Sequence, residues 1–211
     1  MPGITISAAY GLAGAAVAAK VADDLAMPLL DRAISAQVAS ALHVTVKEAE
    51  EGCPHRSFTE RFFAVLSPLA SGVLGAGTDA APHEPAPEPA DDFRQQSEQI
   101  IRQAALNGAV ILGRGGSAAL RDERDVLRVR LFGPVEARLK QAMATLGIDE
   151  ATARRQMHEV DTAREHYVWR LYKVDANDPA LFQLQLDSTA LPLDSCADLI
   201  VRGYRALLGQ V

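Results

Sequence analysis

The first stretch able to do chemistry is residues 4–18, where a β-branched run, two glycines and an alanine-rich segment follow one another. This layout predicts a strand, a tight turn and the start of a helix. Such a turn binds phosphate when backbone N–H groups point at the anion, a lysine reaches the β/γ oxygens and a Ser or Thr hydroxyl binds magnesium. The chain keeps Gly11 and Gly14 but continues with Ala15 and Ala16. The turn therefore has the glycines of a phosphate site without its cation.

Charged residues follow two other apolar runs. Asp31 and Arg32 come after a short apolar element, and Arg114 stands between glycines directly after the run 110–112. An arginine placed in this way presents a planar fork of donors to a phosphate or a base edge. The plainer alternatives are a surface arginine in a turn at 114, and a helix cap beside a solvated charge at 31 and 32. If the runs are parallel strands, we expect Arg32 and Arg114 to face a common cleft beside the turn at 7–14.

Apolar strand patterns alternate with helical patterns along the chain. This alternation predicts an α/β fold with a mostly parallel sheet and helices on both faces. The expected strands are 3–7, 110–112, 126–132 and 181–186, and the expected helices include 13–26, a segment from Phe93 stopped by Gly108, one that starts near Pro134, 149–172 and 197–208. Ligands of such a sheet bind at the carboxyl ends of its strands.

Length and composition favour one domain. The 211 residues are 48% hydrophobic, which is enough for a single sizeable core spanning 1–211. Residues 75–92 consist largely of Ala, Pro, Gly and acid, so we expect a disordered Pro/Ala-rich loop there. Cys53 and Cys196 are isolated, which favours a reduced pair over a disulfide. The expected location is cytoplasmic.

Charge and hydropathy exclude some partners. The net charge is −6, whereas nucleic-acid binding requires a basic face, so no nucleic-acid partner is expected. No apolar run reaches the roughly 18 residues of a membrane span, so no membrane partner is expected. The five histidines share no spacing with Cys or acidic residues, and no metal ligand is predicted. A protein partner stays unspecified.

Taken together, the motifs resemble the cytidylate kinase-like proteins in order and spacing over nearly the whole chain. The matching segments are Ile4-Thr-Ile-Ser, Tyr10-Gly11-x-x-Gly14, Asp31-Arg32, Val110-Ile-Leu-Gly-Arg-Gly-Gly116, Arg128-Val-Arg-Leu131, Asp161-x-x-Arg164-x-x-Tyr167, Tyr172-x-x-Asp175-x-x-Asp178-Pro179 and Leu184-x-Leu-Asp-Ser188. The resemblance implies a P-loop nucleoside monophosphate kinase fold with a phosphate loop, a helical monophosphate-binding region and an arginine-bearing lid. It also implies transfer of the ATP γ-phosphoryl group to a nucleoside monophosphate such as CMP, with ATP and Mg²⁺ as cofactors.

The resemblance assigns roles to residues of this chain. It places Gly11 and Gly14 in the phosphate loop, Asp31, Arg32 and Arg114 in the acceptor site, and Arg164 and Arg170 in the lid as catalytic cations. Phosphoryl transfer depends mainly on positioning and on neutralising charge, which lid arginines can supply. The alternative for the helix over 149–172 is a solvated face, with salt bridges among Glu159, Asp161, Arg164 and Glu165.

The departures from the family pattern leave two functional classes open. Family members usually read Ser-Arg-x-x-Gly-Ser-Gly-Gly-Arg at the loop, whereas Ala8 and Ala15 replace both arginines here. Ala16 stands at the magnesium-ligand position, and Asp187-Ser188 replaces the usual Asn-Thr of the last strand. The chain is then either a kinase whose loop cations are replaced by arginines elsewhere, or a pseudokinase that acts in nucleotide sensing or protein interaction.

Overall fold

The structure, a computed structural model, describes residues 2–31, 89–113 and 115–210. Contacts between Cα atoms group residues 1–33 and 100–211 into one compact unit and residues 34–99 into a second. The second unit lies outside the described residues, apart from the first turns of one helix. The first unit contains all the strands of the sheet.

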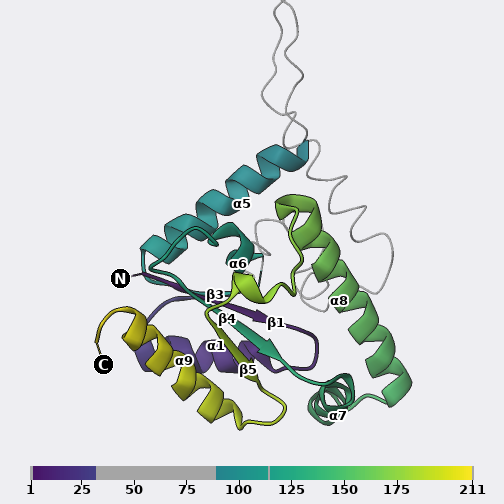
Figure 1. Ribbon diagram of the computed structural model, residues 1–211. Helices are drawn as coiled ribbons and strands as arrows, with labels where there is room; N and C mark the ends of the chain where they lie inside the picture. Colours follow the sequence, from purple (N-terminus) through teal and green to yellow (C-terminus); the bar gives the residue numbers. More distant parts are fainter. Residues whose placement is uncertain (1, 32–88, 114, 211) are drawn as a thin grey trace, which may run out of the picture. The chain divides into compact units, whose positions relative to one another are not determined.

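Five parallel strands form this sheet, in the order β2-β3-β1-β4-β5 (Figure 1). They are β1 (Ile4–Ala8), β2 (Leu29–Asp31), β3 (Val110–Leu112), β4 (Leu127–Phe132) and β5 (Leu184–Asp187). The predicted α/β class and the parallel sheet are confirmed. The three-residue β2 is the brief apolar element before Asp31, and it pairs with β3 rather than directly with β1.

The helices follow the predicted alternation. They are α1 (Gly14–Leu25), α5 (Pro89–Leu106), α6 (Gly116–Ala119), α7 (Val135–Leu146), α8 (Glu150–Tyr172) and α9 (Leu193–Leu207), with a 3-10 turn η1 (Pro179–Leu181) before β5. Because α5 begins at Pro89, four residues of the predicted 75–92 loop are helical, while 75–88 lie outside the described residues.

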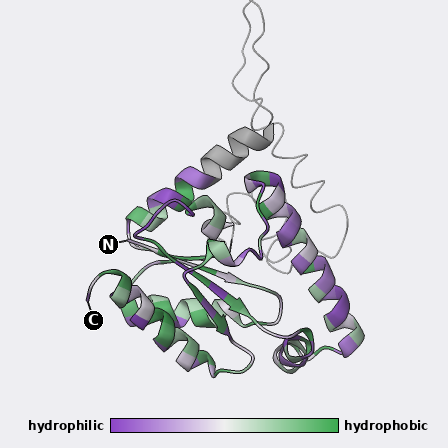
Figure 2. Cartoon of the chain, viewed as in Figure 1, coloured by the Kyte–Doolittle hydropathy of each residue, from purple (hydrophilic) through white to green (hydrophobic). Residues whose placement is uncertain are grey.

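The sheet has two unlike faces because side chains alternate along each strand. On one face Ile4, Ile6 and Val129 are fully buried against α1 and α9. These two helices lie together on that side of the sheet in Figure 1, and α9 is largely apolar in Figure 2. The opposite face carries Thr5 and Arg128, which are paired in register, and it faces α6.

The polar face is held by buried hydrogen bonds. The hydroxyl groups of Thr5 and Ser117 lie 3.2 Å apart, joining β1 to α6. The guanidinium of Arg128 donates to the carbonyl oxygens of Leu120, Glu123 and Leu181, and its burial lowers its pKa. Because Nε and Nη1 are bound to backbone carbonyls, Arg128 stabilises the packing of β4 against its neighbours. Residues that could bind a ligand therefore have to be sought further along the strands, at their carboxyl ends.

Candidate functional site

The loop between β1 and α1 passes close to α7. Gly11 has a φ of 77°, and a Cβ at this position would lie 2.5 Å from the backbone oxygen of Arg138. A Cβ on Gly14 would lie 2.4 Å from Cβ of Ala8. Real Cβ atoms do not approach so closely, so packing requires both predicted loop glycines, and the positive φ of Gly11 adds a conformational requirement at that position.

The inside of the loop is apolar. Leu12 is fully buried in the core, and its carbonyl oxygen accepts a 3.1 Å hydrogen bond from the hydroxyl of Ser188 after β5. Ala15 and Ala16 are exposed in the first turn of α1, and the capping residue Ala13 supplies no side-chain hydrogen bond. The start of α1 therefore offers backbone N–H groups to an anion but no cationic or hydroxyl side chain.

Tyr10, at the tip of the loop, is held by α7 and α8. Its N–H donates to Oδ1 of Asp161 over 3.0 Å, and its carbonyl oxygen accepts from Nε of Arg138 over 2.9 Å. Its phenol donates to Oε1 of Gln156 over 2.6 Å, and burial raises the pKa of this phenol. Three bonds thus join one loop residue to two helices more than 120 residues further along the chain.

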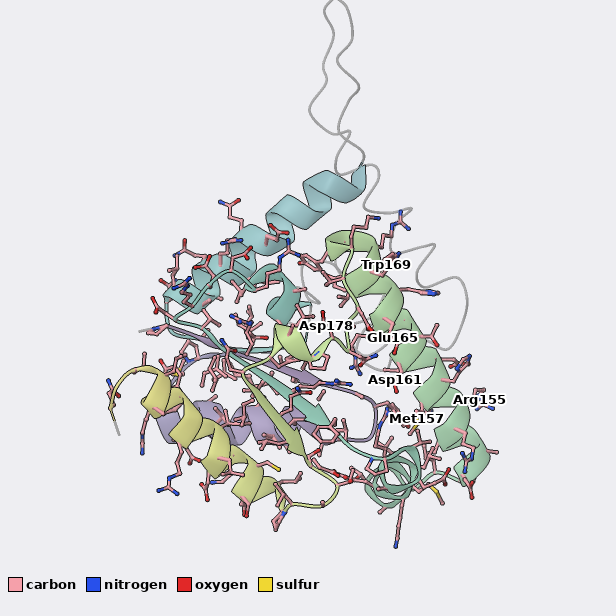
Figure 3. All side chains as sticks on the ribbon, viewed as in Figure 1. Arg155, Met157, Asp161, Glu165, Trp169 and Asp178 are labelled. Atoms are coloured by element: carbon pink, nitrogen blue, oxygen red, sulfur yellow. The ribbon has the colours of Figure 1, made fainter. Side chains whose placement is uncertain are left out.

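The carboxylate of Asp161 is the centre of this network. Besides the Tyr10 N–H it binds the guanidinium of Arg138, whose side chain is 10% exposed, and that of Arg164 at 3.2 Å. Figure 3 shows Met157, Asp161 and Glu165 following one another along α8. Burial lowers the pKa of Arg164, and the neighbouring Arg138 acts in the same direction while Asp161 opposes it. The predicted salt bridge between Arg164 and Asp161 exists, but it lies against the loop.

A third arginine lies on the polar face of the sheet. Arg130 pairs in register with Ser7 at the carboxyl ends of β4 and β1. Its guanidinium donates 2.9 Å hydrogen bonds to the backbone and side-chain oxygens of Asn177 and lies 5.9 Å from the centre of the Phe182 ring. Arg130 is close enough to Arg164 to lower that residue's pKa. Three cations therefore gather beside a loop that has none of its own.

Two hollows adjoin these arginines. A cavity of about 20 Å³ lies at the carboxyl ends of β1 and β3 and is lined in part by Ser7, Gly113 and Arg164. This volume holds roughly one water molecule. A groove of about 470 Å³ runs between α7 and α8, with Arg138 and Asp161 in its wall. The cavity at the ends of β1 and β3 is thus small, whereas the groove beside the loop is wide.

The predicted acceptor residues are described only in part. The backbone of Asp31 pairs with Leu112, so the ends of β2 and β3 are adjacent, as the acceptor-site prediction requires. Arg32, Arg114 and the direction of the Asp31 side chain lie outside the described residues, and their convergence stays a prediction. Arg170 is exposed in the last turn of α8, six residues beyond Arg164.

Sequence reasoning missed two residues of the site. Arg138 interrupts the apolar stripe formed by Leu139 and Ala142 on α7, and an arginine in an apolar stripe is a signal that a buried partner exists. Arg130 alternates with buried residues along β4, and in the sequence it stands out only as part of the motif Arg128-Val-Arg-Leu131. In both cases the pattern places a charge among buried residues without identifying what it binds.

The side chains of the described residues do not suit a magnesium ion. In that part of the chain no group of three His, Cys, Asp or Glu residues could hold a metal. Ala16 has no oxygen to donate, and the Asp187 carboxylate accepts bonds from Thr189 and Ala190 within its own turn. These hydrogen bonds hold the pKa of Asp187 below its usual value.

None of the described helices combines the length and apolarity needed to cross a membrane.

A sequence model of the "Cytidylate kinase-like family" matches residues 3–190. A uronate isomerase from Corynebacterium glutamicum is 26% identical over 110 residues, which are 52% of this chain and 21% of that protein. This chain thus matches about a fifth of the length of that curated relative.

Two solved structures resemble this chain to different degrees. An uncharacterised protein from Eubacterium ventriosum superposes with a TM-score of 0.64 at 20% identity, covering 96% of this chain and 97% of that one. This likeness shows a shared fold. A gluconokinase from Sinorhizobium meliloti is more distant, with a TM-score of 0.48 at 13% identity over 98% of this chain and 93% of that one.

Proposed function

The chain belongs to the cytidylate kinase-like family, and on that premise we propose that it binds nucleotides but transfers the ATP γ-phosphoryl group slowly or not at all. One observation carries this proposal. The loop has no cationic side chain, and both its Tyr10 N–H and the lid cation Arg164 are bound to the carboxylate of Asp161. The cations that would meet a triphosphate are therefore missing from the loop or, in the case of Arg164, already bound to a carboxylate.

The size of the loss supports slow turnover. A hydrogen bond to a charged group contributes about 1.5–3 kcal/mol. Alanines at 8 and 15 remove two such cations relative to the family pattern, and Ala16 removes a hydroxyl. At about 1.4 kcal/mol per tenfold in affinity, two lost contacts weaken ATP binding by roughly a hundredfold or more. The backbone N–H groups at the start of α1 remain for weak anion binding.

The proposed ligand is a nucleoside monophosphate such as CMP, taken up at the strand ends. Support comes from the adjacent ends of β2 and β3, which bring the backbone of Asp31 beside the turn that begins at Gly113. Arg130 and Arg164 lie at the same edge of the sheet. Monophosphate binding needs fewer loop contacts than ATP binding, so it is less affected by the alanines.

Calorimetry with CMP and with ATP-magnesium, run beside a coupled phosphotransfer assay over the common monophosphates, tests this proposal. We expect CMP binding, weak ATP binding and little turnover. Ala15 is exposed, so the double variant Ala8→Arg/Ala15→Arg should raise ATP affinity. Ala206→Arg, the same change at an exposed position of α9, is the control and should leave ATP affinity unchanged.

A second candidate is an active kinase in which arginines elsewhere replace the loop cations. The gathering of Arg130, Arg138 and Arg164 beside the loop favours it. Robust ATP-dependent phosphorylation of CMP by the unmodified protein, abolished by Arg164→Ala or Arg114→Ala, would establish this candidate and refute slow turnover. Absence of both turnover and nucleotide binding would refute both candidates and leave a scaffold for protein contacts.

A further inference from the structure

Donors from three separate elements converge on the Asp161 carboxylate. They are the N–H of Tyr10 from the loop, the guanidinium of Arg138 from α7 and the guanidinium of Arg164 from α8 itself. A backbone N–H and two guanidinium groups aimed at one point are the donors that bind a phosphoryl group in proteins. Asp161 therefore stands where an anion bound by the loop and the lid would stand.

The charge around Asp161 favours an anion even when this carboxylate is counted. Arg138 and Arg164 carry two positive charges against its single negative charge. Arg130 and Glu165, which both bind Asn177 nearby, add one positive and one negative charge that cancel. An excess of one positive charge remains in a part-buried region, where electrostatic interactions are stronger than in water.

The Asp161 side chain also has space to rotate away from these three donors. Its side chain is 22% exposed and forms part of the wall of the open groove of about 470 Å³ between α7 and α8. Rotation toward this groove would free the Tyr10 N–H and both guanidinium groups without moving the backbone of α8. The loop would then present its donors to solvent.

We propose that Asp161 is a built-in competitor for the phosphate site, and that a phosphate-bearing ligand binds at the loop only after displacing this carboxylate. The inference rests on the proposed nucleotide-binding function and adds its regulation. Conditions or partners that draw Asp161 into the groove would open the site. Those that stabilise the contact between loop and helix would keep it closed.

The variant Asp161→Asn tests the competition directly. Asparagine keeps an oxygen for the Tyr10 N–H and nearly the same shape, but it removes the charge that holds the two arginines. Because charge-assisted bonds are about twice as strong as neutral ones, we expect pyrophosphate to bind the variant at least about tenfold more tightly than the wild type by calorimetry. The control is Glu159→Gln, which removes one negative charge two residues away on another side of α8 and should leave affinity unchanged.

A second variant keeps the test decisive if the asparagine variant fails to fold. Tyr10→Phe keeps the Asp161 carboxylate but removes the phenol bond to Gln156, one of the contacts that hold the loop against α8, so we expect a smaller gain in pyrophosphate affinity. Weaker or unchanged binding in folded variants would overturn the inference, because Asp161 would then serve to position the arginines. If the wild type binds CMP but neither variant gains, the inference fails while the proposed function stands. If no protein binds pyrophosphate or CMP, both fail.

Discussion

The backbone N–H of Tyr10 donates a 3.0 Å hydrogen bond to the carboxylate of Asp161, which lies 151 residues further along the chain. The same carboxylate binds Arg138 and Arg164, so the loop after β1 and the two helices α7 and α8 form one connected network. The shape of the loop is therefore not set by its own glycines alone. Substitutions on α7 and α8 should therefore change the conformation of the loop, and substitutions in the loop should change the packing of the two helices.

We expect Arg138→Ala to lower the free energy of unfolding by about 3 kcal/mol, because it removes one partner of a largely buried ion pair. It also removes the donor to the Tyr10 carbonyl. Urea denaturation followed by circular dichroism measures the change. Lys140→Ala, at an exposed position of the same helix, should stay within about 0.5 kcal/mol of the wild type. Equal effects of the two substitutions would contradict the network.

Gly11 should differ from other glycines of positive φ in its tolerance of substitution. Gly11→Ala places a Cβ in the left-handed region and 2.5 Å from the Arg138 backbone oxygen, so the loop or α7 must shift. Gly147 also has a positive φ, of 66°, but nothing lies within 4 Å of the added Cβ. Gly147→Ala should therefore cost about 1 kcal/mol, and Gly11→Ala about 1–3 kcal/mol more because of the steric conflict. Chemical denaturation of both variants measures the two free energies of unfolding. Equal losses would show that the loop accommodates the added methyl group without a steric conflict.

Stability should depend on pH through Asp149, the capping residue of α8. The N–H of Thr152 donates to its carboxylate over 2.8 Å and the Thr152 hydroxyl adds a second bond, which together hold the pKa of Asp149 below its usual value. A carboxylate with a depressed pKa stabilises the fold above its unfolded pKa and loses this effect as the pH falls through its folded pKa. Asp149→Ala should lower Tm at neutral pH, and the difference from the wild type should begin to shrink as the pH falls below about 4 and vanish below the lowered folded pKa of Asp149. A difference independent of pH would refute the charged cap.

The buried pair of hydroxyl groups between β1 and α6 should show coupled energetics. Thr5→Val or Ser117→Ala alone leaves the other hydroxyl without this partner and should cost about 1–3 kcal/mol. The double variant replaces both polar groups with apolar ones and should cost less than the sum of the two single substitutions. A double-mutant cycle by urea denaturation measures the coupling. Strict additivity would show that the two groups do not depend on each other.

The order of elements could be predicted from the sequence because the signals for it are local. Apolar runs such as those at 4–8, 110–112 and 127–132 have the length and composition of buried strands, and helical patterns separate them. Gly11 and Gly14 were also recognisable, since a glycine-containing turn between a strand and a helix is a local pattern. The parallel sheet, the loop and the family all followed from such features.

Only the tertiary structure decided what the charged residues bind. The sequence predicted Arg164 as a lid cation or as part of a solvated face, whereas its carboxylate partner Asp161 turns toward a loop 151 residues away. In the sequence Arg138 is one charge among apolar neighbours, and only the structure shows that it binds the carbonyl oxygen of Tyr10. The strength of such contacts depends on burial and on the distance between groups that the chain brings together only when it folds. The spacing of apolar residues repeats along every helix and strand, so secondary structure can be predicted from short segments of sequence. The partner of a buried charge is a single residue far away in the sequence, and only the packing of the folded chain determines which one it is.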